Sequence, residues 1–299
     1  MTHMLRGTGT ALATPFNADG SIDFESFARL VDTQIEGGVE MLVPLGSTGE
    51  NPTITPRERA EIIRWVVEYT DHRAIVIAGT GTNDTRSSIE YTREAMTLGA
   101  DAALIVTPYY NKPTPQGLFE HFKAIGDVGL PLVMYNVPGR TGLNMTAETS
   151  LRCAEIENVA AIKEASADLA QCMEIIHNAP DGFNLLSGED NLTMPLISLG
   201  AQGVVSVASN VVPREFSRMV RFALDGKFEE ARALHYELLE LMRVNFIESN
   251  PGPVKAALAM RGIIKEYYRL PLVPVKPESK KKIREVLERL DSVLMEEMA

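Results

Sequence analysis

The sequence is poor in the residues that build disulfide frameworks and metal sites. Its 299 residues include two cysteines, Cys153 and Cys172, and five histidines. The cysteines form no CxxC arrangement and the histidines share no short spacing, so neither a zinc nor a non-haem iron site is expected. Two sparse cysteines are typical of a reducing compartment, where each acts as a small buried apolar side chain.

Long apolar runs and an excess of basic residues are also missing. No stretch approaches the roughly 18 apolar residues of a membrane-spanning helix, and the N-terminus lacks a basic and then apolar signal pattern. We therefore expect a soluble, cytoplasmic protein with no membrane partner. Acidic residues outnumber basic ones by 40 to 29, a net charge of −11. That charge argues against nucleic acid as a partner.

A nucleotide-binding fingerprint is incomplete. The segment AGTGTND (78–84) follows an apolar run and opens a helical pattern. It lacks the third glycine that lets a helix pack closely behind a bound pyrophosphate, so a dinucleotide cofactor is not expected.

Eight short apolar runs alternate with longer helical patterns. The runs cover residues 9–14, 41–45, 74–78, 102–107, 132–136, 159–163, 183–187 and 204–208. They are apolar throughout, which is typical of parallel strands covered on both faces. Eight β-α units are the number in a closed (β/α)8 TIM barrel, which is the fold we predict. An open doubly wound sheet is the alternative. Such a sheet usually carries a glycine-rich phosphate-binding fingerprint, and the AGTGTND segment matches that fingerprint only in part.

The strand signals end near residue 212. Helical patterns follow over residues 213–224, 228–246, 253–261 and 280–298. We therefore predict a barrel catalytic domain at residues 1–226 and a C-terminal helical extension at residues 227–299.

One lysine stands where an apolar strand should close. Lys163 ends the strand run at residues 159–163 within NVAAIKEA (158–165). A lysine there can extend its ammonium group to water or pair with Glu164. It can also act as a buried amine with a lowered pKa that attacks a carbonyl and forms a Schiff base. The second reading is favoured by position, because active sites of these barrels form where strands end at the C-terminal face.

Other polar residues follow neighbouring strands. Tyr135 ends the preceding strand and offers a phenol for proton transfer, although a buried tyrosine is more often core. Ser47 and Thr48 lie in a glycine-flanked turn that suits a carboxylate cradle or a plain tight turn. Arg140, on a loop, has a planar guanidinium that suits a second carboxylate, although such an arginine is usually solvated.

Together these segments resemble the dihydrodipicolinate synthase / N-acetylneuraminate lyase family of class I aldolase-type barrels. The match covers essentially the whole chain, through GSTGE, AGTGTN, TPYYNKP, YNVPGRTG, AIKEA, LLSGED, GVVSVASN and NPGPVK in that order. Each motif alone is weak, and their order makes the match specific.

The resemblance implies that Lys163 forms a Schiff base with pyruvate, with no cofactor and no metal. It implies a proton relay through Tyr135, Ser47 and Tyr110, the last supplied by the neighbouring subunit of a tight dimer. A homotetramer built as a dimer of dimers is implied as well.

The resemblance also implies the substrate contacts. Thr48 would help to hold the pyruvate carboxylate, and Gly188 and the backbone of Val205 would line the site. Arg140 is typical of the branch that condenses pyruvate with aspartate semialdehyde on the lysine and diaminopimelate pathway, where it receives the second carboxylate. Ser47 departs from that branch, which usually has threonine, but a serine hydroxyl can perform the same relay.

Two other functions remain open from the sequence. One is a pyruvate-dependent aldolase of a sugar acid, of the 2-keto-3-deoxygluconate or N-acetylneuraminate type, and the other is a non-catalytic barrel used as a scaffold. Lysine-sensitive members of the family bind feedback lysine through a histidine and a glutamate. Arg59 and Ser87 occupy the matching positions, and an arginine repels ammonium groups, so weak or absent lysine inhibition is expected.

Overall fold

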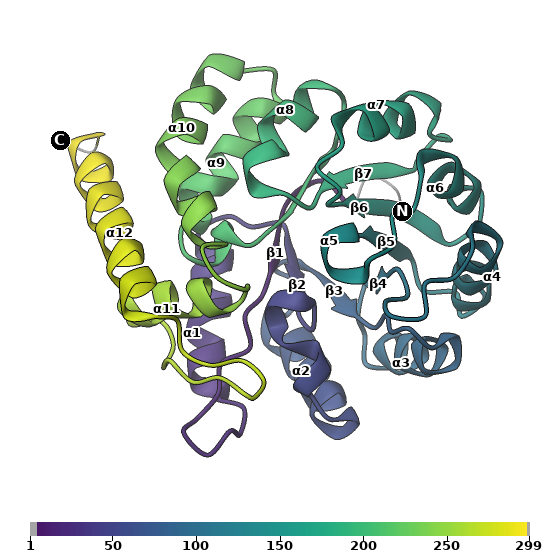
Figure 1. The fold of residues 1–299 in the computed structure, drawn as a ribbon, viewed down its shortest axis with the longest axis horizontal. Coiled ribbons are helices and arrows are strands. Elements are labelled where there is room, and N and C mark those ends of the chain that lie inside the picture. Colours follow the sequence, from purple (N-terminus) through teal and green to yellow (C-terminus); the bar gives the residue numbers. More distant parts are fainter. Residues whose placement is uncertain (1–4, 298–299) are drawn as a thin grey trace.

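The computed structural model describes residues 5–297, which form a closed barrel of parallel strands, β1 to β8 in chain order (Figure 1). The strands are β1 (Gly7–Ala11), β2 (Met41–Val43), β3 (Ile75–Gly79), β4 (Ala102–Val106), β5 (Leu132–Asn136), β6 (Val159–Glu164), β7 (Asn184–Ser187) and β8 (Gly203–Ser206). Pairing of β1 with β8 closes the ring. The predicted (β/α)8 barrel is confirmed.

The first strand lies earlier in the chain than its apolar run indicated. β1 covers Gly7–Ala11 rather than residues 9–14. Its sequence GTGTA alternates glycine and threonine, so it has little apolar character to mark it. The register explains the position, because Gly7 and Gly9 lie opposite Gly203 and Val205 of β8. A Cβ on Gly203 would lie 2.0 Å from the Gly7 carbonyl oxygen, so this seam admits only glycine there.

Helices follow every strand and cover the outside of the barrel. They are α1 (Phe24–Glu36), α2 (Pro56–Thr70), α3 (Thr85–Thr97), α4 (Pro115–Gly126), the short α5 (Pro138–Thr141), α6 (Ala147–Ala154), α7 (Leu169–Asn178), α8 (Thr193–Ser198) and α9 (Pro213–Leu224). A capping box fixes the start of α2, where Thr55 accepts from the Glu58 backbone and Glu58 accepts in return. No helix within residues 5–297 is long and apolar enough to span a bilayer.

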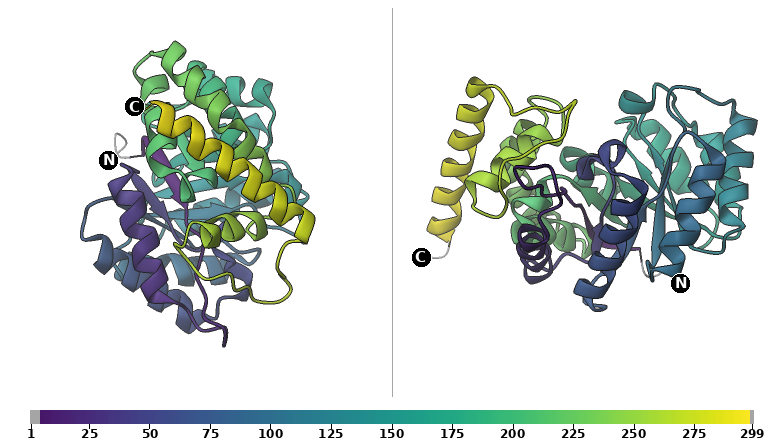
Figure 2. Two further views of the ribbon diagram at one scale, coloured as in Figure 1. Left: turned by 90° about the vertical axis from the view of Figure 1, so that its left-hand side faces the viewer. Right: turned by 90° about the horizontal axis from the view of Figure 1, so that it is seen from below.

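Three further helices follow α9 and pack together on one side of the barrel, as Figure 2 shows from two directions. They are α10 (Phe228–Val244), α11 (Gly252–Met260) and α12 (Pro277–Glu297). The predicted helical extension is therefore present. The boundary predicted after residue 226 falls in the turn between α9 and α10, and the division into two domains stays a prediction. Residues 1–4 and 298–299 of the predicted domains lie outside the described part of the chain.

Side chains of the strands alternate between two apolar clusters. One cluster fills the space between strands and helices and includes Leu132, Met134 and Ile162. The other fills the barrel interior and includes Val133, Tyr135, Ala161, Leu186 and Val205. Because neighbouring residues of a strand face opposite sides, a residue two places beyond Ala161 also faces the interior.

Candidate active site

Lys163 lies on the interior face of β6, two residues after Ala161. It is 5% exposed, and its backbone lies opposite Tyr135 of β5 in the sheet register. The side-chain nitrogen is 4.3 Å from the centroid of the Tyr135 ring. An amine held against an aromatic face in the barrel interior does not extend to bulk water, so the solvated strand end considered for Lys163 is wrong.

The carboxylate next to Lys163 in sequence faces the other way. Glu164 accepts hydrogen bonds from Asn136 at 3.0 and 3.1 Å, from the Ser166 backbone at 2.7 Å and from Gln171 at 3.0 Å. Burial raises the pKa of the Glu164 carboxyl, and these hydrogen bonds oppose the rise. Glu164 is therefore part of a polar network behind β6, and the pairing with Lys163 is replaced by these partners.

The Ser47–Thr48 turn is held in an unusual backbone shape. Residues Ser47–Gly49 form a single 3-10 turn, and Leu45 and Glu50 on either side have positive φ values of 61° and 56°. Non-glycine residues rarely adopt this conformation, and it is concentrated at functional sites. Thr48 is 2% exposed and accepts a hydrogen bond of 3.0 Å from the Asn250 side chain.

Arg140 reaches the same region from the loop after β5. It lies in the short helix α5 (Pro138–Thr141), and its Nη2 donates to the Asn250 carbonyl oxygen at 3.2 Å. The residue is exposed, so most of its guanidinium donors stay available to a ligand.

A cavity of about 480 Å³ joins these elements. Its lining includes Ser47, Tyr135, Arg140 and Asn250. Lys163 and Thr48 lie behind this wall and contact it, through the Tyr135 ring and the Asn250 amide respectively. The structure thus brings five of the predicted site residues to this cavity or directly behind its wall, and this volume suits a small metabolite.

Gly188 directly follows β7, and Val205 lies on β8, two and three strands along the barrel from Tyr135 on β5. Gly188 donates its backbone N–H to the Glu164 carbonyl at 2.7 Å, and a Cβ on it would lie 2.6 Å from that of Ala165. A side chain at position 188 would therefore collide with the end of β6. Val205 belongs to the interior cluster and is 1% exposed.

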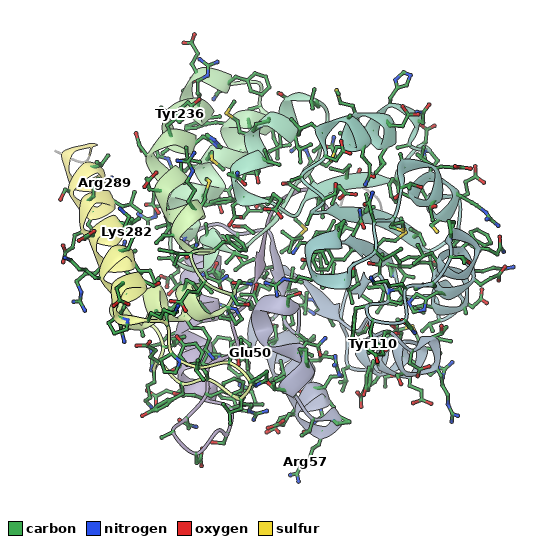
Figure 3. All side chains as sticks on the ribbon, in the orientation of Figure 1. Glu50, Arg57, Tyr110, Tyr236, Lys282 and Arg289 are labelled. Carbon is green, nitrogen blue, oxygen red and sulfur yellow. The ribbon has the colours of Figure 1, made fainter. Side chains whose placement is uncertain are left out.

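Tyr110 lies apart from the other predicted residues. It has a positive φ of 71° in the loop between β4 and α4 and is 90% exposed (Figure 3). It is not among the residues that line the cavity of its own chain. A role for Tyr110 in this chemistry therefore depends on a second subunit.

Two carboxyl groups close to Lys163, the half-buried Glu189 and the buried Asp190, were not assigned from the sequence. Burial raises the pKa of Glu189, and the charge of Asp190 adds to this effect, whereas the positive charges of Lys163 and Arg140 oppose it. Burial also raises the pKa of Asp190, against hydrogen bonds from residues 206–208. The SGED motif was visible as a strand end, but only the fold shows that its acids lie within electrostatic reach of Lys163.

A buried ion pair was missed as well. Glu50 and Lys255 are 2.5 Å apart, with side chains 1% and 0% exposed. Glu50 ends the GSTGE motif and Lys255 ends NPGPVK. Their separation of 205 residues hides the pair from any local pattern.

The chain is similar to known proteins of one family over nearly its full length. Residues 4–290 match the model of the dihydrodipicolinate synthetase family. The chain is 50% identical to a protein of Koribacter versatilis and 49% identical to one of Parabacteroides distasonis, both named 4-hydroxy-tetrahydrodipicolinate synthase. These matches cover 94% and 96% of this chain and 95% and 97% of the relatives. The crystal structure of dihydrodipicolinate synthase from Aquifex aeolicus superposes with a TM-score of 0.94 at 42% identity, covering 96% of this chain and 98% of that one. The chain belongs to the dihydrodipicolinate synthetase family.

Proposed function

We propose that this protein condenses pyruvate with aspartate semialdehyde, the activity named for its relatives as 4-hydroxy-tetrahydrodipicolinate synthase. The observation that carries the proposal is the placement of Lys163 in the barrel interior, 4.3 Å from the centre of the Tyr135 ring. Tyr135 in turn lines a cavity that Arg140 also lines. A buried amine, a phenol and a guanidinium are the groups that this reaction requires.

The chemistry begins with the neutral amine of Lys163, which attacks the ketone carbon of pyruvate. Loss of water gives an imine, and the protonated imine withdraws electrons from the adjacent methyl carbon. That carbon loses a proton and becomes an enamine, which attacks the aldehyde carbon of aspartate semialdehyde. The amino group of the new adduct then attacks the imine carbon, expels the Lys163 amine and closes the ring, with net release of water.

Proton transfer is assigned to three hydroxyl groups. Tyr135, against the Lys163 amine, serves the carbinolamine, and Ser47 at the cavity wall relays protons to it. Tyr110 of the partner subunit completes the relay. Its exposure of 90% in one chain supports this assignment, because a side chain so placed is free to enter a neighbour. The role of Tyr110 requires at least a dimer, and the family resemblance implies a homotetramer built as a dimer of dimers.

The substrate contacts are assigned from the family resemblance, and the position of Arg140 on the cavity wall supports its part in them. Thr48, with Gly188 and the backbone of Val205, holds the pyruvate end, and Arg140 takes the carboxylate of aspartate semialdehyde as a planar fork of donors. No metal or organic cofactor is assigned, since the iminium group on Lys163 supplies the electron withdrawal.

Turnover of competing substrates in the presence of EDTA tests the proposal. Purified protein with pyruvate and aspartate semialdehyde should form the cyclic product at a rate that EDTA leaves unchanged. The same protein should not cleave 2-keto-3-deoxygluconate or N-acetylneuraminate at a comparable rate. Cleavage of either sugar acid in preference to the condensation would replace the proposal with the sugar-acid aldolase.

A further inference from the structure

Asn250 bridges the two loops to which the proposed function assigns the two substrate carboxylates. Its side-chain nitrogen donates to Thr48 Oγ1 at 3.0 Å, and its backbone carbonyl accepts from Arg140 Nη2 at 3.2 Å. It is 5% exposed and lines the same cavity as Tyr135 and Arg140. One residue from the C-terminal extension thus contacts both the turn after β2 and the loop after β5.

The bridge is anchored by the buried ion pair. Lys255, at the second turn of α11, is bound to Glu50 at 2.5 Å, and its backbone N–H donates to the Pro251 carbonyl at 3.0 Å. Glu50 follows Thr48 by two residues. The segment that carries Asn250 and the turn that carries Thr48 are therefore joined at both ends, which fixes the distance between them.

The direction of the Asn250 hydrogen bond determines what Thr48 can do. An amide N–H is a donor only, so the Thr48 oxygen is the acceptor in this contact. Its hydroxyl hydrogen is then left for another acceptor, and none occurs among the hydrogen bonds of residues 5–297. A carboxylate oxygen is an acceptor that fits this vacant direction.

We infer that Asn250 is a positioning residue for both substrates. Its side-chain amide turns the Thr48 hydroxyl into a donor toward the pyruvate carboxylate, and its backbone carbonyl orients the Arg140 guanidinium toward the second carboxylate. The inference rests on the proposed function for the identity of the two substrates.

Asn250→Asp separates the two contacts. The carboxylate is nearly the same shape but only accepts hydrogen bonds, so Thr48 must donate to it and the hydroxyl is lost to pyruvate. The backbone carbonyl that orients Arg140 is unchanged. The KM for pyruvate should rise about tenfold or more, while the KM for aspartate semialdehyde should change less than about threefold. Asn250→Ala, which leaves the Thr48 hydroxyl free to rotate, should raise the KM for pyruvate less than Asn250→Asp does.

A double-mutant cycle distinguishes positioning from simple charge repulsion. In a Thr48→Val background the hydroxyl is gone, so Asn250→Asp should add almost no further increase in the KM for pyruvate. If the added charge acted directly on pyruvate, the increase would persist in that background and would overturn the inference. Asn178→Asp, the same change at an exposed position on α7, should leave both KM values at their wild-type level.

Borohydride trapping gives a second readout that needs no aspartate semialdehyde. The pyruvate concentration that half-saturates the trapped adduct should rise in Asn250→Asp by the same factor as the KM. A wild-type enzyme that traps pyruvate but does not use aspartate semialdehyde would refute the proposed function. The comparison of pyruvate half-saturation between wild type and Asn250→Asp would still test the role of Asn250. Values within twofold of wild type in both assays would overturn the role of Asn250, provided that the melting temperature shows a folded variant.

Discussion

The Lys163 side-chain nitrogen lies 4.3 Å from the centroid of the Tyr135 ring, and the two residues face each other across neighbouring strands. Tyr135 also lines the cavity, so the ring links the buried amine to the space that a substrate would occupy. The barrel thereby holds the proposed nucleophile beside its proposed proton-transfer partner.

Removal of the Arg140 guanidinium should weaken the binding of aspartate semialdehyde and leave that of pyruvate unchanged. In Arg140→Ala, the KM for aspartate semialdehyde should rise about 10- to 100-fold, because a bidentate contact to its carboxylate is lost. The pyruvate concentration needed for borohydride trapping should stay unchanged. Arg57→Ala, at an exposed arginine of α2 shown in Figure 3, is the matched control and should match wild type. A normal KM in Arg140→Ala would remove this residue from substrate binding.

Loss of the buried lysine should destabilise the fold strongly. Lys255→Met leaves the Glu50 carboxylate buried without its ion-pair partner, which costs about 3–5 kcal/mol in the free energy of unfolding. Urea denaturation followed by circular dichroism measures the loss. Adding Glu50→Gln should recover part of it, because the uncompensated charge is then gone. Arg29→Met breaks an exposed pair with Glu25 and should cost less than about 1 kcal/mol. If Lys255→Met and Arg29→Met lost the same free energy of unfolding, burial of the Glu50–Lys255 pair would not explain its contribution.

Acid should weaken the protein partly through Glu58. Its hydrogen bonds with Arg269 lower the pKa of the Glu58 carboxyl from 4.5 to about 2. Because the folded-state pKa is lowered, the stabilisation is fully present above pH 4.5 and is lost as the pH falls from there through 2. In Glu58→Gln, the free energy of unfolding should therefore fall less steeply between pH 5 and pH 3 than in wild type, as roughly one fewer proton is taken up. If the free energy of unfolding fell equally steeply with pH in both proteins, the lowered pKa of Glu58 would be contradicted.

Free lysine should inhibit weakly or not at all. The Arg59 guanidinium lies 4.3 Å from the centre of the Tyr91 ring and donates to the Gly79 carbonyl at 2.7 Å. This fixed cation would repel an approaching ammonium group, and Ser87 has no charge to attract one. Initial rates at increasing lysine concentration measure the effect. The double variant Arg59→His with Ser87→Glu should be the more sensitive enzyme. Half-inhibition of wild type at sub-millimolar lysine would refute the prediction.

Much of the fold could be predicted because its signals are local. Most of the strands are marked by apolar runs, and the alternation of side chains along β6 already places Lys163 with Ala161 on one face. β1 was displaced in the prediction because a glycine and threonine strand lacks that signal, and its position depends on the seam with Gly203.

The parts of the site that escaped prediction are contacts between distant segments. Asn250 and Thr48 are 202 residues apart, and Lys255 and Glu50 are 205 apart. No periodicity records such a contact, because it exists only after the C-terminal extension has packed against the barrel. Tyr110 differs again, since its proposed role requires a partner subunit and so cannot be checked from contacts within one chain.

Identification of the residue that carries trapped pyruvate tests the central claim most directly. Protein treated with pyruvate and borohydride, then digested and analysed by mass spectrometry, should carry one reduced adduct, on the peptide that contains Lys163. Lys163→Ala should carry no adduct and should lose activity, although its fold persists. An adduct on any other lysine, or a Lys163→Ala protein as active as wild type, would contradict the account.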